Sequence, residues 1–370
     1  MSDVRDVPRR AGHRSRAGLG GRLRIALDAM GTDRHPTVEV EGAIEALREL
    51  ADDFELVLVG DRDKIEAELT RCGETAPERL HIVHAPDRIE PGEPPATAVR
   101  RKPQSSIVAG LKLQREGKAD AFVSAGSTGA VMAASLLILR AVPGVDRPTV
   151  AAVLPTAQDP VVLVDAGANV DSKPGHLLQF ARLGAVYAED VLRRPSPRVG
   201  LLNIGEEPEK GNELAVETYG LLQRSGLNFV GNIEGRDIIS GVCDVLVTDG
   251  FAGNVLLKFY ESVAGFVYQL IARELAEKGT EVHLERVARV LDYTEYGGAP
   301  LLGVNGISIV CHGESPPRAI KNAIRVASQA VGARMLGHIR RELGALPTNG
   351  AAALPPDTNT SPKERLAEGA

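Results

Sequence analysis

Short apolar runs alternate along this chain with longer stretches in which apolar residues recur every three or four positions. The first pattern predicts buried strands, and the second predicts amphipathic helices. Their alternation over most of the chain is typical of a sheet covered by helices on both faces. The expected strands are residues 24–27, 54–59, 80–84, 121–124, 149–154, 161–165, 198–202, 228–232, 244–248 and 307–310. The expected helices are residues 40–50, 61–71, 106–116, 128–141, 177–191, 214–224, 254–278, 282–291 and 317–343.

Two of the expected strands, 149–154 and 161–165, are joined by a Pro-bearing link that is too short to hold a helix. Parallel neighbours need a crossover of a dozen or more residues, so these two strands are expected to pair antiparallel. The pattern therefore predicts an α/β fold with a mixed sheet. Residues 89–103 are rich in Pro and are expected to be irregular.

The net charge of −6 is spread unevenly over the 370 residues. Residues 1–22 hold six Arg against two Asp, which predicts a disordered basic tail, and the Pro- and Ala-rich residues 344–370 predict a second disordered tail. The domain between them, residues 23–343, is acidic, and the chain has few aromatics and no Trp, so no nucleic-acid partner is expected.

The spacing of the Cys and His residues and the absence of nucleotide motifs indicate the compartment and the cofactors to expect. The three Cys are scattered, which suggests a reducing cytoplasm, and no uninterrupted apolar run approaches the roughly 18 residues of a membrane span. The eight His show no zinc spacing, so no metal is expected. Neither glycine-rich nucleotide fingerprint is present, so no cofactor is expected.

Several expected strands end in turns of Gly, Ser, Thr, Asn or Asp, and a helical pattern follows at once. Such a turn presents backbone N–H groups at a helix N-terminus, where the helix dipole favours an anion. In the turn at residues 124–129, two glycines and the neighbouring hydroxyls are candidate phosphate or oxyanion contacts. These candidates are Ser124, Gly126, Ser127, Thr128 and Gly129. The alternative is that Ser127 or Thr128 simply caps the helix.

The turn at residues 165–169 follows a fully apolar strand and carries a second set of candidates. Gly167 and Ala168 are candidate phosphate or oxyanion contacts, Asn169 is a candidate catalytic amide, and Lys173 is a candidate anion clamp. The structural alternative places Asn169 in left-handed backbone and makes Asp171 the N-cap of the next helix.

Other strand ends add single candidates. Asp28 and Asp249 are candidates for acid–base work or for orienting a basic group. Asn203, Gly205 and Asn254 are candidate phosphate contacts, although the acidic residues after Gly205, Glu206 among them, would repel a phosphate.

Two further candidates carry a basic or titratable group. Lys102 follows Arg100 and Arg101 and forms the strongest local positive cluster, with a solvated loop as the alternative. Cys311 and His312 end the last expected strand and invite a thiolate–imidazole interpretation. Adjacent strand residues point to opposite faces, so a nucleophile–base pair is not expected there, and His312 stays a candidate base only.

Taken together and in order, these segments resemble the bacterial phosphate acyltransferase family, the PlsX type. The resemblance runs from Arg24 to about Leu336. Three departures are mild: Thr32 stands where a second glycine is expected, Ser127 where Asn is frequent, and Ser172 where Cys is frequent. The last implies that the chemistry needs no thiol there. The segments that carry the resemblance are residues 28–33, 124–130, 165–174, 200–214, 231–237, 249–258 and 296–303.

The resemblance implies a fold similar to isocitrate/isopropylmalate dehydrogenase and phosphotransacetylase. That fold is a three-layer α/β/α structure with one large, mixed, mostly parallel sheet and a deep cleft, and it forms a homodimer. The resemblance also implies that a fatty acyl group passes from acyl carrier protein to inorganic phosphate. The acyl phosphate would then feed a membrane glycerol-3-phosphate acyltransferase in phospholipid synthesis.

In such a reaction phosphate is the nucleophile, so no acyl-enzyme is needed, and the protein must hold the dianion and stabilise the oxyanion. The turns at 124–129 and 167–169 would make these contacts, with Lys102 or Lys173 supplying charge. Asp28, Asp249, Glu206 or His312 would orient these groups or handle protons.

Carrier protein is usually acidic and the core of this chain is also acidic, so a local basic patch must attract it. The candidates are Arg100, Arg101, Lys102, Arg193 and Arg194. Some members of the resembled family touch membrane through a helical tip after the long helix, here a projection over about residues 254–291. Residues 273–289 balance four basic against four acidic side chains, so we expect a cytoplasmic protein with weak or indirect membrane association.

Three competing classes remain at this stage. A nicotinamide dehydrogenase could share the fold, a phosphotransacetylase acting on short acyl-CoA could share both fold and chemistry, and a carrier-protein or phosphosugar binding module would lack catalysis. Production of acyl phosphate from palmitoyl carrier protein and phosphate separates all of them.

Overall fold

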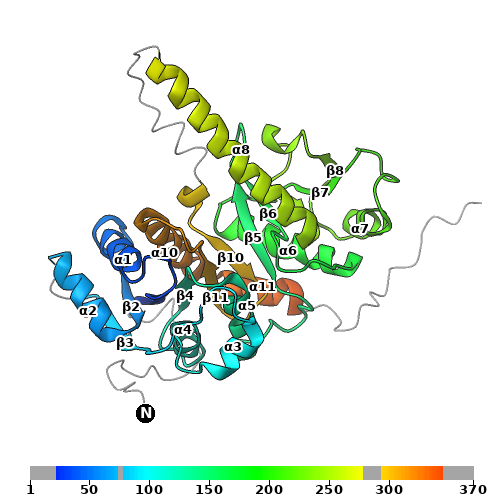
Figure 1. Ribbon diagram of the computed structural model, residues 1–370. Helices are drawn as coiled ribbons and strands as arrows, with labels where there is room; N and C mark the ends of the chain where they lie inside the picture. Colours follow the sequence, from blue (N-terminus) through cyan, green and yellow to red (C-terminus); the bar gives the residue numbers. More distant parts are fainter. Residues whose placement is uncertain (1–21, 74–77, 278–292, 345–370) are drawn as a thin grey trace, which may run out of the picture.

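The sheet runs through the whole of the described molecule. The computed structural model describes residues 22–73, 78–277 and 293–344 (Figure 1). Its 11-stranded sheet has the order β3-β2-β1-β4-β11-β10-β5-β6-β9-β7-β8. The strands are β1 (Leu23–Asp28), β2 (Phe54–Gly60), β3 (Leu80–His84), β4 (Ala121–Ser124), β5 (Thr149–Leu154), β6 (Val161–Val164), β7 (Val199–Asn203), β8 (Phe229–Glu234), β9 (Val245–Val247), β10 (Ala299–Leu302) and β11 (Ile307–Val310).

Strand direction reverses in the middle of this sheet. As expected, β5 and β6 pair antiparallel, and β10 pairs antiparallel to both β11 and β5. All other neighbours are parallel. The carboxyl ends of β1 to β5 and β11 therefore lie on one side of the sheet, which we call the first edge. The carboxyl ends of β6 to β10 lie on the opposite side, which we call the second edge. Asp28, Ser124 and His312 lie at the first edge, and Asp165, Asn203 and Asp249 lie at the second.

Helices cover both faces of the sheet, which confirms the α/β expectation. Along β1, Ile25 and Leu27 enter the core beneath α1, α6, α10 and α11, whereas Ala26 enters the core beneath α3, α4 and α5. A third core under the base of α8 takes alternate residues of β5, β6 and β9. The helices are α1 (Thr37–Glu49), α2 (Arg62–Arg71), α3 (Pro95–Arg101), α4 (Ser106–Arg115), α5 (Thr128–Ile138), α6 (Pro174–Asp190), α7 (Glu213–Gln223), α8 (Gly250–Glu277), α10 (Pro317–Gly332) and α11 (Met335–Gly344).

Three expectations about elements were wrong. The Pro-rich segment 89–103 contains α3, because Pro94 and Pro95 fall at the N-cap and first turn, where a missing N–H costs nothing. The last helix is two helices, since Arg334 takes a positive φ of 58° and ends the first of them. Strand β10 was not expected, because its Ala-Pro-Leu-Leu sequence is short and carries a proline.

Helix α8 begins earlier than expected, at Gly250, and Figure 1 shows its far end extending away from the sheet. Among the described helices it alone is long and apolar enough, by length and composition, to cross a membrane. The criterion of an unbroken apolar run had missed it because Lys258 and Glu261 interrupt the sequence. At its base, Leu256, Leu257 and Tyr260 pack against the sheet core. The expected helix at 282–291 and both terminal tails lie outside the described residues.

Candidate active site

Three loops meet at the first edge, one after each of β1, β4 and β11. The hydroxyl of Ser124 donates to Asp28 Oδ2 at 2.7 Å. The N–H of Cys311 donates to the carbonyl of Ser124 at 2.8 Å, and the N–H of Asp33 donates to the carbonyl of Gly313 at 2.9 Å. Asp28 and Ser124 are both buried, so they fix the loops beneath the surface. The predicted candidates Asp28, Ser124 and His312 are thus brought together.

Burial raises the pKa of the Asp28 carboxyl, while the hydrogen bond from Ser124 and other donors acts in the opposite direction. The backbone N–H of Met30 donates to the second Asp28 oxygen at 3.0 Å. A carboxyl held on both oxygens and closed off from solvent is suited to shaping the loops. It is poorly placed to exchange a proton with a bound substrate.

The N-terminus of α5 is the candidate anion-binding element of this edge. Its N-cap, Ser127, makes no side-chain capping hydrogen bond, so the capping alternative was wrong for Ser127. The N–H of Gly126 donates to Ser124 Oγ at 3.0 Å. The first helix-closing bond runs from Val131 to Ser127 at 2.9 Å. The N–H groups of Thr128, Gly129 and Ala130 therefore precede the regular ladder and are the natural donors to an anion.

Gly31 shows how tightly the loop after β1 packs on this turn. A side-chain carbon at Gly31 would lie 2.7 Å from the N–H nitrogen of Gly126. No real Cβ tolerates that approach to backbone, so a larger residue would push the two loops apart. The glycine is therefore required for the 124–129 turn to keep its position.

Lys102 sits behind the site in an ion pair. Its Nζ lies 2.6 Å from Glu93 Oε1 and donates to the carbonyl of Arg88 at 2.8 Å. The hydrogen bond from Lys102 lowers the pKa of the Glu93 carboxyl. Lys102 is thus engaged in holding the segment that carries Arg88.

Arg88 is a basic residue of this edge that the sequence interpretation missed. Its Nε donates to the carbonyl of Met30 at 2.8 Å, and its Nη1 lies 2.7 Å from Glu90. Its charge also lowers the pKa of Asp28 slightly against the effect of burial. No local signal marks it, because the carbonyls that it contacts lie 56 and 58 positions away in the chain.

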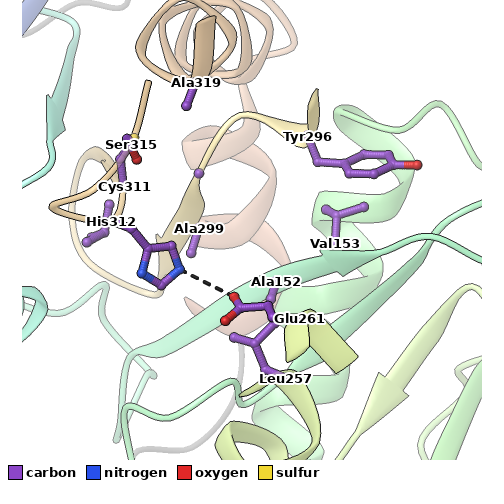
Figure 2. Close-up of a pocket in the computed structure, with 12 residues that line it drawn as sticks. Ala152, Val153, Leu257, Glu261, Tyr296, Ala299, Cys311, His312, Ser315 and Ala319 are labelled. Carbon is purple, nitrogen blue, oxygen red and sulfur yellow. Dashed lines mark ion pairs between the residues drawn. The ribbon is translucent and has the colours of Figure 1, made fainter. Parts of the chain in front are cut away.

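His312 stands at the mouth of a small, mostly apolar cavity (Figure 2). Its Nε2 lies 3.4 Å from Glu261 Oε1 of α8, and Lys258 Nζ lies 2.8 Å from the other oxygen of that carboxylate. The cavity encloses about 60 Å³. It is lined by Ala152, Val153, Leu257, Glu261, Tyr296, Gly298, Ala299, Val310, Cys311, His312, Ser315 and Ala319.

Cys311 does not act as a thiolate here. Its side chain is buried, and burial raises the pKa of the thiol to about 12. His312 contacts a carboxylate on another helix and is about half exposed. The structure agrees with the expectation that these neighbours form no nucleophile–base pair.

The turn at residues 165–169 is built differently. The buried Asp165 carboxylate accepts hydrogen bonds from the N–H groups of Gly167, Ala168 and Asn169 at 3.2, 3.0 and 2.7 Å, and from Val150 N–H at 3.1 Å. The Asn169 amide donates to Asp165 and to the carbonyl of Pro148, each at 2.8 Å. The donors that the sequence offered to a phosphate are therefore occupied within the protein.

The structural alternative for this turn was also wrong in detail. Gly167, with a φ of 131°, takes the unusual backbone conformation, and Asn169 does not. The N-cap of α6 is Lys173 and not Asp171. The Lys173 side chain is exposed at that helix start.

The start of α8 packs directly on this turn. The N–H of Gly250 donates to the carbonyl of Asn169 at 2.8 Å. A carbon at Gly167 would lie 3.2 Å from Asn254. Asp249 accepts from the N–H groups of Phe251 and Ala252, both at 2.9 Å, so it serves as an N-cap of α8.

Asn203, which is half-buried, and Gly205, which is buried, lie at the second edge, where β7 ends and its loop begins. Asn203 donates to the carbonyl of Lys210 at 2.9 Å and accepts from the N–H of Ile204 at 2.8 Å, so its amide closes its own loop. Gly205 lies against the side chains of Glu207 and Lys210. Neither residue is joined to the loops of the first edge by any contact described above.

The two glycine-rich turns do not share a site within one chain. Between β4 and β6 the sheet order places β11, β10 and β5, which makes four strand spacings, or roughly 19 Å. The turns also leave the sheet in opposite directions. One phosphate, a few ångströms across, cannot contact both. The structure thus separates the first-edge candidates, which include the 124–129 turn, from Gly167, Ala168, Asn169, Lys173, Asn203, Gly205, Asp249 and Asn254.

Comparison with known proteins decides the family. Residues 23–337 match the family described as Fatty acid synthesis protein. A phosphate acyltransferase of Desulforamulus reducens is 51% identical over 328 residues, covering 87% of this chain and 97% of the relative. One of Heliobacterium modesticaldum is 50% identical over 329 residues, covering 87% and 98%. The chain belongs to the phosphate acyltransferase family, the PlsX type. It is a transferase that moves an acyl group to phosphate.

Solved structures support the fold. EutD phosphotransacetylase from Staphylococcus aureus superposes with a TM-score of 0.56 at 16% identity, covering 84% of this chain and 94% of that one. A phosphotransacetylase from Streptococcus pyogenes gives 0.55 at 17% identity, covering 86% and 96%. The phosphotransacetylase-like architecture expected from the resemblance is confirmed.

Proposed function

We propose that this protein transfers a fatty acyl group from acyl-[acyl carrier protein] to inorganic phosphate and releases acyl phosphate. The observation that carries the proposal is the uncapped N-terminus of α5, held by Asp28 and Gly31 at the meeting point of three loops. Phosphate binds there through the backbone N–H groups of residues 128–130 and the hydroxyls of Ser127 and Thr128. The family membership supplies the acyl chemistry.

In this mechanism phosphate attacks the thioester carbonyl directly. The protein fixes the dianion near the carbonyl carbon, which converts an encounter of two substrates into a reaction within one complex. Donors at the helix start stabilise the oxyanion that forms. The neutral, buried Cys311 thiol fits a route without an acyl-cysteine intermediate.

The direct test is to incubate the full chain with palmitoyl carrier protein and phosphate and to measure hydroxylamine-reactive acyl phosphate. The expected result is acyl phosphate that depends on phosphate. Replacing the donor by acetyl-CoA and longer acyl-CoA thioesters separates this activity from a phosphotransacetylase. If the chain binds carrier protein but forms no acyl phosphate with any donor, the proposed function is wrong.

The proposed docking site for acyl carrier protein is the basic end of α3. Arg100 and Arg101 are exposed in its last turn, and α3 packs against α5, the helix that begins at the phosphate turn. Lys102 and Arg194 already form ion pairs with Glu93 and Asp159, so they are weaker candidates for binding carrier protein. Alanine at Arg100 and Arg101 should raise the apparent KM for carrier protein and leave that for phosphate unchanged. Arg193→Ala, an exposed candidate after α6, is the matched comparison.

We further propose a homodimer in which a second copy covers the exposed face of α8. An apolar row with helical spacing runs along this face, opposite the residues that pack on the core. The row consists of Phe251, Val255, Phe259, Val263, Phe266 and Leu270, each at least 40% exposed. Light scattering should give the mass of two chains, and Phe259→Glu should give that of one. A monomeric wild type would contradict this proposal.

The remaining partners follow from the product. Acyl phosphate is an activated acyl donor, and we propose that it passes to a membrane glycerol-3-phosphate acyltransferase from a cytoplasmic enzyme that associates weakly or indirectly with the bilayer. Flotation of the pure protein with anionic vesicles measures that association. Strong flotation of a dimeric sample would show that the membrane contact is direct.

A further inference from the structure

Glu261 and His312 form an acid–imidazole pair that the steps above leave without a role. Glu261 comes from the middle of α8, and His312 from the loop after β11, so the pair joins two elements that are 51 positions apart in sequence. In Figure 2 the imidazole is directed toward the carboxylate at one side of the cavity. This contact between two distant elements fixes the position of the His312 ring beside the cavity.

The Glu261 carboxylate is kept ionised by its hydrogen-bond donors. Burial alone would raise the pKa of Glu261, but the hydrogen bonds from His312 and Lys258 outweigh burial and lower it. The carboxylate is 17% exposed, whereas the His312 side chain is 45% exposed. Glu261 thus holds Nε2 of the ring, and almost half of the His312 side chain remains exposed.

The position of the ring relates it to the phosphate turn. β11 is the direct neighbour of β4, and Val310 pairs with Ser124 in register. The loops that carry His312 and the 124–129 turn therefore start one strand spacing apart, about 5 Å. Among the described residues, Tyr296 and Cys311 line the same cavity, and Asp33 lies against Gly313 in the loop that follows His312.

The cavity beside the ring has the size and lining for a thioester. Its walls are mainly Ala, Val and Leu side chains, and its volume of about 60 Å³ holds a few heavy atoms. It takes the sulfur, the carbonyl group and the first methylene groups, and the rest of a long acyl chain must lie elsewhere.

We propose that His312 carries the proton of the reaction and that Glu261 is its positioning residue, an inference that rests on the proposed function. A phosphate oxygen of HPO₄²⁻ forms a bond to the carbonyl carbon, and the carbon–sulfur bond breaks. His312 accepts the proton that leaves the phosphate hydroxyl and delivers it to the departing sulfur. The products are acyl phosphate and the free thiol, with no net gain or loss of protons. Glu261 holds the other ring nitrogen, which sets the tautomer and the direction of the ring.

The test compares two thioesters of the same acyl group, one of carrier protein and one of a nitrothiophenol. The alkyl thiolate of the carrier is the stronger base and the poorer leaving group, with a thiol pKa of about 8.5 like that of Cys, whereas the nitrothiophenolate leaves without a proton. With the carrier thioester, His312→Ala should lower kcat about 100-fold. With the nitrothiophenol thioester the loss should shrink to within about tenfold. Added imidazole should restore part of the carrier reaction.

Glu261→Gln provides the second variant and keeps the shape of the side chain. It should lower kcat about tenfold with the carrier thioester and leave both KM values within about twofold, since the residue acts through His312. Glu217→Gln, an exposed residue of α7, is the matched control. Equal losses for both thioesters in His312→Ala, or no loss in Glu261→Gln, would overturn the proposal while the proposed function stands. A wild type that forms no acyl phosphate would overturn both.

Discussion

The turns at 124–129 and 165–169 look alike in sequence, since each follows a buried strand, contains glycine and hydroxyl or amide residues, and precedes a helix. In three dimensions they differ in where their N–H groups point. The first leaves the N-terminal donors of α5 without a side-chain cap. The second turns its N–H groups onto its own buried carboxylate, Asp165. A glycine-rich turn is therefore an anion site only when no internal acceptor has already taken its donors.

The largest expected effect is a loss of stability when Asp165, the internal acceptor of the 165–169 turn, is removed. Asp165→Ala leaves four backbone N–H groups without their acceptor, and each buried donor costs roughly 1–3 kcal/mol. The free energy of unfolding should fall by about 5 kcal/mol, measured by urea denaturation. A loss under about 1 kcal/mol would mean that water replaces the carboxylate and that these donors are available to a ligand after all.

A second buried acid, at the first edge, gives stability a pH dependence. Glu39 accepts from the N–H and hydroxyl of Thr32 at 2.6 and 3.0 Å, and burial raises its pKa from 4.5 to about 7. A raised acid pKa means that the folded state holds its proton longer than the unfolded state does. The contribution of Glu39 to stability is therefore greatest below pH 4.5 and is lost as pH rises to about 7. Relative to Glu39→Gln, wild type should lose about 3 kcal/mol over this range. Parallel stability curves for the two proteins would contradict the assignment.

The 124–129 turn, whose N–H groups point outward, is tested by removing the backbone N–H of Thr128 while α5 stays intact. Thr128 is the first residue of α5, where proline is tolerated, and Ser127 before it (φ −52°, ψ 119°) lies outside the α region that a following proline disfavours. Thr128→Pro should lower kcat about 100-fold, or about 2.7 kcal/mol, with little change in unfolding. Thr128→Ala separates the hydroxyl from the N–H.

The matched control places proline at the same helical position away from the site. Glu213 is the exposed first residue of α7, which follows the cap Asn212. Glu213→Pro should leave activity unchanged. If both prolines reduced activity equally, the effect of Thr128→Pro would be structural.

The smallest effect concerns the cap of α8. Asp249→Ala removes two hydrogen bonds to the helix start and should cost about 1 kcal/mol of stability, seen as a small shift of the unfolding midpoint. Its kcat should stay within about twofold of wild type after correction for folded protein. A drop of 100-fold would return Asp249 to the list of acid–base candidates.

The alternating pattern was enough to predict most strands, the antiparallel β5–β6 pair and the α/β class, because burial imposes a regular spacing on each element. The pattern could not show that β6, β7 and β9 end at the edge opposite β1 and β4. That property depends on where β10 inserts, and the short β10 leaves almost no signal. Asn169 and Asp249 were grouped with Ser127 for this reason. Arg88 and Glu261 were missed because their partners lie far away in the chain.

Helix α8 contacts both edges of the sheet. Its first residue is bonded to Asn169 at the second edge, and Glu261, 11 residues later and about 16 Å along the axis, faces His312 at the first. Leu256, Leu257 and Tyr260 pack on the sheet core along this stretch, so α8 is held between its first residue and Glu261. A shift of Glu261 by about 1 Å can change a reaction rate about 100-fold. Asn169→Ala keeps the backbone carbonyl that Gly250 contacts but removes the amide hydrogen bonds to Asp165 and Pro148. We therefore expect it to alter kcat through the packing of α8 on this turn.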